Sequence, residues 1–179
     1  MNDTQVIKLR AGGEYVFDVV ETKAGWVGIA GRDGKVSTIQ MPAPTKDEAV
    51  ARLRAGIDGD LVESNHGFES LARQLADYFA GKKTQFTFEP DLDSLTDFQQ
   101  RVLRVTMTVP WGSVVSYRWI AEKAGSPLAF RAAGQALGQN PIPIAIPCHR
   151  VVASGGKLGG YSGGLHWKVQ LLELEGVRL

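Results

Sequence analysis

Residues 140–152 read NPIPIAIPCHRVV, and this stretch holds the single cysteine of the chain, Cys148. Its three prolines within seven residues fix an extended, stiff backbone, because each proline restricts its own φ and the residue before it. A lone cysteine is most often a buried small hydrophobic residue, but here His149 follows directly and Arg150 comes next. A neighbouring imidazole can take the thiol proton, and a nearby positive charge lowers the pKa of a thiol. The stretch therefore predicts a nucleophilic cysteine on a rigid mount.

The residues that follow add a loop and a possible orienting acid. Residues 154–164 place six glycines around Tyr161, which predicts a backbone that closes over a flat ligand with its N–H groups exposed. This loop lacks the Gly-Lys-Ser/Thr order of a phosphate-binding loop. A final helix is expected over residues 165–174. Near its end, Glu173 and Glu175 are both candidates for the acid that orients His149.

Two short helices are predicted upstream of the cysteine. Ser116 is expected to cap a helix over residues 117–124, and Gly125 supplies a tight turn. Ser126 is expected to cap the second helix, with a proline at its first position and its end near residue 137. The pattern fits a helix-turn-helix and equally an ordinary helix pair within a bundle.

The composition of the second predicted helix limits what it can bind. Residues 128–137 contain one arginine, one glutamine, four alanines and one glycine. A helix that reads sequence in the major groove needs several long polar side chains, and this helix lacks them. A slender helix can instead approach the minor groove, with Arg131 as its only charged projection. The expectation is DNA binding with little base specificity.

The first half of the chain has the texture of a small α/β domain. Turn signals, including the hairpin signal Asp33-Gly34, separate four segments of strand length. Thr45 and Glu48 form a predicted capping box. The expected strands cover residues 5–10, 14–20, 26–30 and 35–41, and the expected helices cover 49–57 and 68–80. A connector that can contain a short strand at 86–88 leads to a helix that Thr96 or Asp97 is expected to cap and that runs to about residue 108. We place the boundary between domains 1–91 and 92–179.

Composition excludes several classes of protein. One cysteine permits no intrachain disulfide, and three scattered histidines make a Cys/His zinc cluster improbable. The polar start MNDTQVIKLR is not a signal peptide, and no apolar run approaches a membrane span, so a cytoplasmic or nuclear protein is expected. Residues 1–91 carry 11 Lys and Arg against 14 Asp and Glu, a net charge of −3, whereas residues 92–179 carry 9 against 5, a net charge of +4. This asymmetry is a modest hint that the second half meets an anion.

From about residue 95 to the end, the chain resembles the O6-alkylguanine-DNA alkyltransferases, the methylated-DNA–protein-cysteine methyltransferases. The resemblance rests on the following segments: Val115-Ser116-Tyr117, Arg131, Gly138-Gln139-Asn140-Pro141, residues 147–152, residues 160–164 and Leu172-Glu173-Leu174-Glu175-Gly176. It implies an α+β protein with a small ribonuclease-H-like α/β domain and a mostly helical domain that carries a winged-helix-like helix-turn-helix.

The implied function is direct-reversal DNA repair. A damaged guanine is flipped out through the minor groove of double-stranded DNA, and its O6-alkyl group moves irreversibly to Cys148; O4-alkylthymine is a second expected substrate. The resemblance implies a monomer that acts once, binds DNA with little sequence specificity, and uses no membrane, metal or organic cofactor.

Roles follow residue by residue from the resemblance. His149 removes the thiol proton through a water and is oriented by Glu175, Asn140 braces the hinge, and Tyr117 protonates the leaving guanine. The expected DNA-binding residues are Tyr117, Ala129, Phe130, Arg131, Ala132 and Gly134. The expected pocket residues are Pro143, Val151, Tyr161, Ser162 and Gly163. Phe130 departs from the small residue that is commoner in the family.

Three other functions remain open from the sequence. A non-catalytic relative that only flags alkylated DNA would carry Trp in place of Cys148, so the present residue disfavours it. A transcription regulator would need a second DNA-reading or Cys-rich module, which is absent from the sequence. A Cys–His hydrolase is favoured only if the helix-turn-helix is a coincidence.

Overall fold

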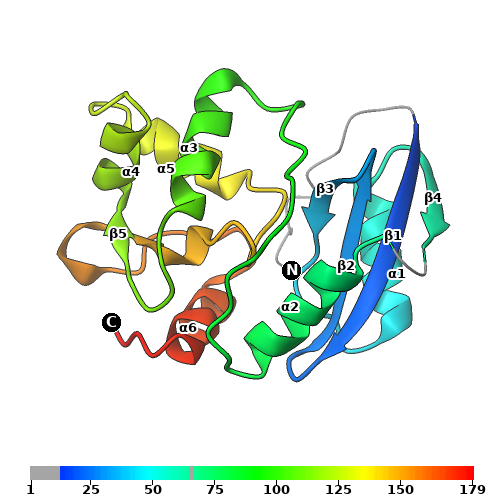
Figure 1. Ribbon diagram of the computed structural model, residues 1–179. Helices are drawn as coiled ribbons and strands as arrows, with labels where there is room; N and C mark the ends of the chain where they lie inside the picture. The colour runs from blue at the N-terminus through cyan, green and yellow to red at the C-terminus, as the bar shows by residue number, and fades with distance from the viewer. Residues whose placement is uncertain (1–12, 65–66) are drawn as a thin grey trace. The chain divides into compact units, whose positions relative to one another are not determined.

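The computed structural model describes residues 13–64 and 67–179, and it divides the chain into two compact units with the break between Ser94 and Leu95 (Figure 1). The strand expected over residues 5–10 lies outside the described residues. The protein is α+β: one unit is built on a sheet and the other is mostly helical. No helix in the two described ranges is long and apolar enough to cross a membrane.

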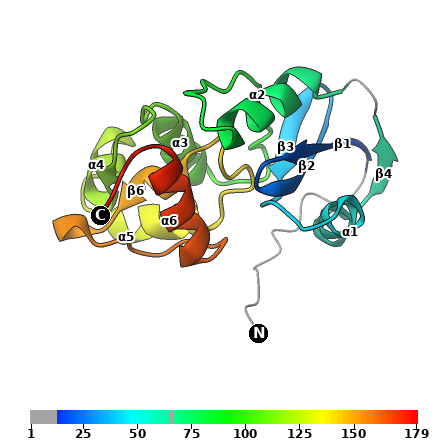
Figure 2. The same cartoon turned by 90° about the horizontal axis from the view of Figure 1, so that it is seen from below.

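The first unit is a four-stranded sheet between two helices. Its strands stand in the order β3 (Lys35–Ile39), β2 (Gly25–Arg32), β1 (Glu14–Thr22) and β4 (Asp60–Glu63). β1, β2 and β3 are antiparallel neighbours, whereas β4 runs parallel to β1. Figure 2 shows α1 (Lys46–Gly56) and α2 (Glu69–Phe79) on opposite sides of this sheet. One core cluster, beneath α1, consists of Tyr15, Phe17, Ala30, Leu53 and Ile57.

Local signals predicted most of this unit. Asp33 and Gly34 both have positive φ, 52° and 74°, as the hairpin signal requires. The Thr45 side chain accepts from the Glu48 N–H at the start of α1. The strand expected over residues 86–88 is wrong: the chain there is extended but unpaired, and only an isolated bridge joins Val36 to Pro90.

The second unit is a group of short helices with one small parallel strand pair. α3 (Asp97–Met107) begins with the Thr96–Gln99 capping box and packs against α5 (Phe130–Gly138), which also packs against α4 (Tyr117–Lys123). β5 (Val115–Ser116) pairs with β6 (Val151–Val152). The remaining elements are two 3-10 turns, η1 (Cys148–Arg150) and η2 (Ser154–Gly156), and the final helix α6 (Leu165–Leu174).

The second helix of the predicted pair begins later than expected. Ser116 caps α4 as predicted and Gly125 makes the turn with φ 77°. Ser126 does not cap α5; instead its carbonyl accepts from the Ala129 N–H at 2.9 Å and closes a turn. Pro127 occupies the second position of that turn, which its fixed φ favours. The helix therefore starts at Phe130.

Candidate active site

Cys148 is buried at the start of η1 and is held by Asn140. The Asn140 side-chain amide donates to the carbonyl of Ile146 at 2.9 Å and to the Cys148 sulfur at 3.1 Å, while its Oδ1 accepts from the Ile142 N–H at 3.0 Å. The Asn140 side chain thus contacts the proline-rich segment near its start, at Ile142, and near its end, at Ile146, as well as the thiol. A hydrogen bond to sulfur favours the thiolate, so the contact with Asn140 lowers the pKa of the Cys148 thiol, although it does not outweigh burial.

The backbone leading to the cysteine is strained at one residue. Ile144 is buried and has a φ of 73°, a conformation that β-branched residues rarely adopt. Hydrogen bonds around it hold this conformation: the Ala145 N–H donates to Pro143 and the Ile146 N–H donates to Ile142, both at 2.9 Å. Such strain persists only where surrounding contacts fix it, which agrees with a rigid mount for the sulfur.

His149, Arg150 and Glu175 form a buried cluster. His149 Nε2 lies 2.8 Å from one carboxylate oxygen of Glu175, and Arg150 binds both oxygens through Nε at 2.8 Å and Nη2 at 2.9 Å. The Gly112 N–H donates to the same carboxylate at 3.2 Å. Glu173 is exposed, so Glu175 is the acid that contacts His149.

The pKa values of the cluster follow from these contacts. Burial alone would raise the pKa of Glu175, but hydrogen bonds and charges from His149 and Arg150 outweigh it and lower that pKa to about 2. Burial lowers the pKa of His149, although Glu175 opposes the shift. Glu175 is therefore an ionised acceptor at neutral pH and His149 a neutral imidazole whose Nε2 carries the proton. Nδ1 is then the ring nitrogen able to accept one.

The expectation that a neighbouring positive charge lowers the thiol pKa is wrong in its net direction. Burial raises the pKa of the Cys148 thiol, and the Asn140 hydrogen bond and the charge of Lys168 offset only part of that shift. Arg150, the cation next but one in sequence, is bound to the carboxylate of Glu175 and its charge is largely balanced there.

Lys168 is a functional residue that the sequence analysis missed. Its side chain is fully buried, and its ammonium donates to the carbonyl of Val151 at 2.6 Å and to that of Gly160 at 3.2 Å. Burial lowers its pKa to about 8, against an opposing effect of Cys148. The available signal was helical spacing. Lys168 precedes Leu171 by three residues and Glu175 by seven, so a helix places all three on the same face, which is the buried face of α6.

Tyr117, at the start of α4, faces the glycine-rich loop. Its hydroxyl donates to the Gly160 carbonyl at 3.4 Å, and burial raises its pKa. A Cβ on Gly159 would stand 2.7 Å from this hydroxyl, and the φ of Gly159 is 71°. Only glycine permits so close an approach of the loop to Tyr117.

A cavity of about 530 Å³ opens onto the cysteine. It is lined by Cys148 and Tyr117, by the α5 residues Phe130, Arg131, Gly134, Gln135, Leu137 and Gly138, and by the loop residues Gly160, Tyr161 and Ser162. Seven of the fifteen expected site residues thus line this cavity, and Asn140, His149 and Glu175 lie outside its lining, in the contacts described above. The described residues that line this cavity do not include five of the expected DNA-binding and pocket residues: Ala129, Ala132, Pro143, Val151 and Gly163. Val151 is fully buried, and its carbonyl accepts a hydrogen bond from Lys168.

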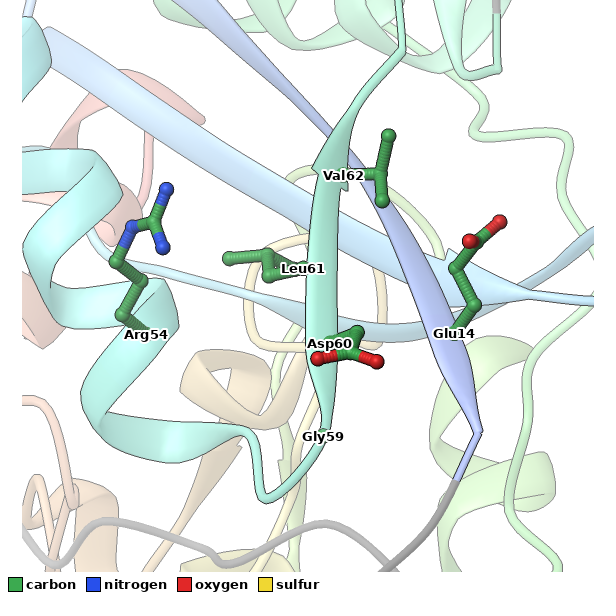
Figure 3. A pocket seen from close by; sticks show the side chains of 6 residues that line it. All are labelled: Glu14, Arg54, Gly59, Asp60, Leu61 and Val62. Carbon is green, nitrogen blue, oxygen red and sulfur yellow. The ribbon is translucent and has the colours of Figure 1, made fainter.

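A second cavity, of about 520 Å³, lies in the first unit. Figure 3 shows Arg54 extending from α1 toward the side of β4 that carries Leu61, while Glu14 lies beyond the other side of that strand. Its other lining residues are Gly59, Asp60 and Val62. None of the six lining residues is a cysteine, serine or histidine, so we place the reactive centre in the cavity at Cys148. No group of three or more metal-ligating side chains occurs in the described part of the chain.

Comparison with known proteins identifies the family. Residues 97–177 match the family model for the DNA binding domain of 6-O-methylguanine DNA methyltransferase. A methylated-DNA–protein-cysteine methyltransferase of Mycolicibacterium paratuberculosis is 42% identical over 89% of this chain and 91% of its own length. The chain belongs to the methylated-DNA–protein-cysteine methyltransferase family.

Solved structures of the family share this fold. The O6-methylguanine methyltransferase of Mycobacterium tuberculosis superposes with a TM-score of 0.73 at 38% identity, over 90% of this chain and 92% of that one. The same organism's OGT in complex with DNA gives a TM-score of 0.72 at 38% identity, over 90% and 93%. Every residue of the cavity at Cys148 lies within the segment that matches the methyltransferase family model.

Proposed function

We propose that this protein repairs O6-alkylguanine in double-stranded DNA by transferring the alkyl group to its own Cys148. The observation that carries the proposal is the sulfur itself: it lies in a cavity, takes a hydrogen bond from Asn140, and is followed by a neutral histidine fixed on an ionised glutamate. Relatives that share the fold and 42% of the sequence are named for this transfer.

The proposed reaction needs a base at the thiol and an acid at the leaving group. His149 accepts the thiol proton through a water, and the thiolate attacks the alkyl carbon attached to O6. The carbon–oxygen bond breaks, its electron pair stays on the guanine, and Tyr117 protonates the base. Since burial raises the pKa of Tyr117, its phenol stays protonated until the guanine anion develops. His149 then releases the proton that it took and Tyr117 regains one through solvent, so in net the proton lost by Cys148 is the one gained by guanine.

The proposed transfer occurs once per molecule. Its product is a thioether, and a thioether sulfur is a poor leaving group at neutral pH. No step in the scheme regenerates the thiol or requires a metal or organic cofactor. The cavity volume of about 530 Å³ also accommodates an aromatic group, so we expect benzyl as well as methyl to be accepted from guanine, with O4-alkylthymine as a second DNA substrate.

We further propose that α5 enters the minor groove and that Arg131 fills the stack left by the flipped base. Arg131 is exposed and lines the cavity mouth together with Phe130 and Gly134. Tyr117, Ala129 and Ala132 complete the proposed DNA contacts. The small residues of α5 allow close approach but offer few groups that read bases, so binding has little sequence specificity.

The remaining assignments are part of the same proposal. Tyr161 stacks on the flipped base, and the backbone N–H of Ser162 donates to it. Pro143, Val151 and Gly163 support the pocket from behind its lining. Residues 1–91 form a ribonuclease-H-like domain and residues 92–179 a domain with a winged-helix-like helix-turn-helix in this proposal, whose boundary lies three residues before the break between the two compact units. The protein acts as a monomer in the cytoplasm or nucleus, where it meets DNA.

A duplex oligonucleotide bearing O6-methylguanine with a labelled methyl group tests the proposal. The label should move to the protein and unmodified guanine should remain in the DNA. Label that stays in the DNA would favour a non-catalytic damage binder, and label released as a small molecule would favour a hydrolase. Cys148→Ser is the matched control and should accept no label.

A further inference from the structure

Leu128 is the most exposed large hydrophobic residue of the described chain. Leu128 is 88% exposed, against 45% for Val62, 49% for Leu165 and 56% for Leu179. Single exposed apolar residues are common on protein surfaces and mean little alone. The position of Leu128, however, sets it apart from the other three exposed hydrophobic residues.

Leu128 is presented on an ordered turn. The carbonyl of Ser126 accepts from the N–H of Ala129 at 2.9 Å, and Pro127 between them has a fixed φ. Gly125 precedes this turn with φ 77°. In Figure 1 the loop between α4 and α5 extends away from both helices. The side chain is thus held out from the fold by its backbone.

The turn adjoins the mouth of the reactive cavity. Phe130 and Arg131, two and three residues after Leu128, both line the cavity that contains Cys148. Consecutive Cα atoms are about 3.8 Å apart, so the Cα of Leu128 lies within about 8 Å of the Cα of Phe130. In the proposed DNA complex, a base that reaches Cys148 passes the first turn of α5, because Phe130 and Arg131 line the cavity. The flanking nucleotides then lie within reach of Leu128.

The chemistry around Leu128 matches the wall of a DNA groove. The guanidinium of Arg118 stands 5.2 Å from the centre of the Phe130 ring, and Arg118 and Arg131 are both exposed. The surface therefore alternates apolar and basic groups within a half of the chain that carries a net charge of +4. Basic groups bind phosphates, whereas the deoxyribose carbons between the phosphates are apolar.

We propose that Leu128 packs against the deoxyribose wall of the minor groove beside the flipped nucleotide, with the Arg118–Phe130 pair next to it. This inference rests on the proposed repair of duplex DNA and adds an apolar anchor to the phosphate contacts. An apolar contact releases no counterions, so the part of the affinity that Leu128 supplies is independent of salt concentration.

Binding of an unmodified duplex, measured over a range of salt concentrations, tests the proposal. Leu128→Ala should bind about fivefold more weakly at every salt concentration, with an unchanged slope of log K against log salt. Leu128→Lys should bind with a slope steeper by about 0.9, because its ammonium would meet the phosphates that flank this wall. Val62→Ala, which removes an exposed apolar group from the first unit, is the matched control and should bind as the wild type does.

Wild-type affinity in Leu128→Ala would overturn the proposal, and so would the same loss of affinity in Val62→Ala. A wild-type slope in Leu128→Lys would also overturn it. Reaction of each variant with free O6-benzylguanine separates this proposal from the proposed function. If the wild type alkylates Cys148 but Leu128→Ala binds DNA normally, only the groove contact fails. If the wild type does not react with O6-alkylguanine in any form, the repair function itself fails.

Discussion

The imidazole of His149 is fixed by Glu175, whose carboxylate oxygen lies 2.8 Å from Nε2 although 26 residues separate the two in sequence. A carboxylate with a pKa of about 2 can only accept at neutral pH, so Nε2 carries the ring proton. This tautomer leaves Nδ1 as the ring nitrogen that can accept the thiol proton in the proposed reaction. Arg150 holds the same carboxylate through two nitrogens and keeps it from moving with the ring.

Replacing this carboxylate should slow the reaction without abolishing it. In Glu175→Gln the ring of His149 loses its charged partner, and both tautomers become populated. We expect transfer from methylated duplex to slow about 10- to 100-fold, which is part of the contribution of a general base. Single-turnover rates would measure this, and a wild-type rate would remove Glu175 from the proposed mechanism.

The same carboxylate should make the fold sensitive to acid. The pKa of Glu175 falls from 4.5 to about 2 on folding. Its contribution to stability is therefore complete above pH 4.5 and is lost as the pH falls from 4.5 toward 2; it amounts to about 3 kcal/mol. Urea unfolding of the wild type across this range should show the loss, and Glu175→Gln should show less of it. If the free energy of unfolding fell equally with pH in the wild type and in Glu175→Gln, the acid sensitivity could not be assigned to Glu175.

Lys168 should tune the reactivity of the thiol. Its charge lowers the pKa of Cys148, so Lys168→Met should move the pH profile of alkylation by free O6-benzylguanine to higher pH. At neutral pH we expect a rate on the order of tenfold lower, as for the loss of one nearby charge. Lys168→Arg keeps the charge and should retain most of the profile. An unshifted profile in Lys168→Met would assign the lysine to loop anchoring alone, through Val151 and Gly160.

Arg131 should matter for duplex DNA only. A free base needs no flipping, whereas flipping a base costs a few kcal/mol that an inserted side chain offsets. Arg131→Ala is therefore expected to slow repair of duplex DNA about tenfold or more and to leave reaction with free O6-benzylguanine nearly unchanged. Arg104→Ala, which removes an exposed arginine of α3 outside the cavity lining, is the control and should react like the wild type with both substrates. Equal losses of Arg131→Ala on both substrates would place Arg131 in the fold or the pocket instead.

Local sequence signals predicted the elements around the site because they depend on neighbouring residues. The caps at Thr96 and Ser116 and the prolines before Cys148 act within a few positions, and the structure contains each of them. The α5 start was misplaced because Ser and Pro at 126 and 127 satisfy a helix N-terminus and a β-turn equally well.

Features that depend on distant residues were beyond the local patterns. β4 is a short strand with polar ends, and it exists through parallel pairing with β1. The thiol pKa could not be assigned from the sequence, because the charge of Arg150 is balanced by Glu175, 25 residues away, while the cation that does act on Cys148 is Lys168. A lysine is usually read as a surface residue, although its place on the apolar face of α6 argued otherwise.

Cys148 is the proposed permanent acceptor of the alkyl group. The chemical step and DNA binding are then separable, because Cys148 lies in the cavity whereas most of the proposed DNA contacts lie on α4 and α5. Cys148→Ser should therefore bind duplex DNA like the wild type and transfer nothing. Loss of DNA binding in this variant would contradict the separation.

Intact-protein mass spectrometry with an excess of methylated duplex tests this claim most directly. We expect each protein molecule to gain one methyl group and no more, and peptide mapping to place that group on Cys148. Repaired guanine should accumulate to one equivalent of protein and then stop. Repair that continues beyond one equivalent of protein, or a methyl group found on any other residue, would contradict it.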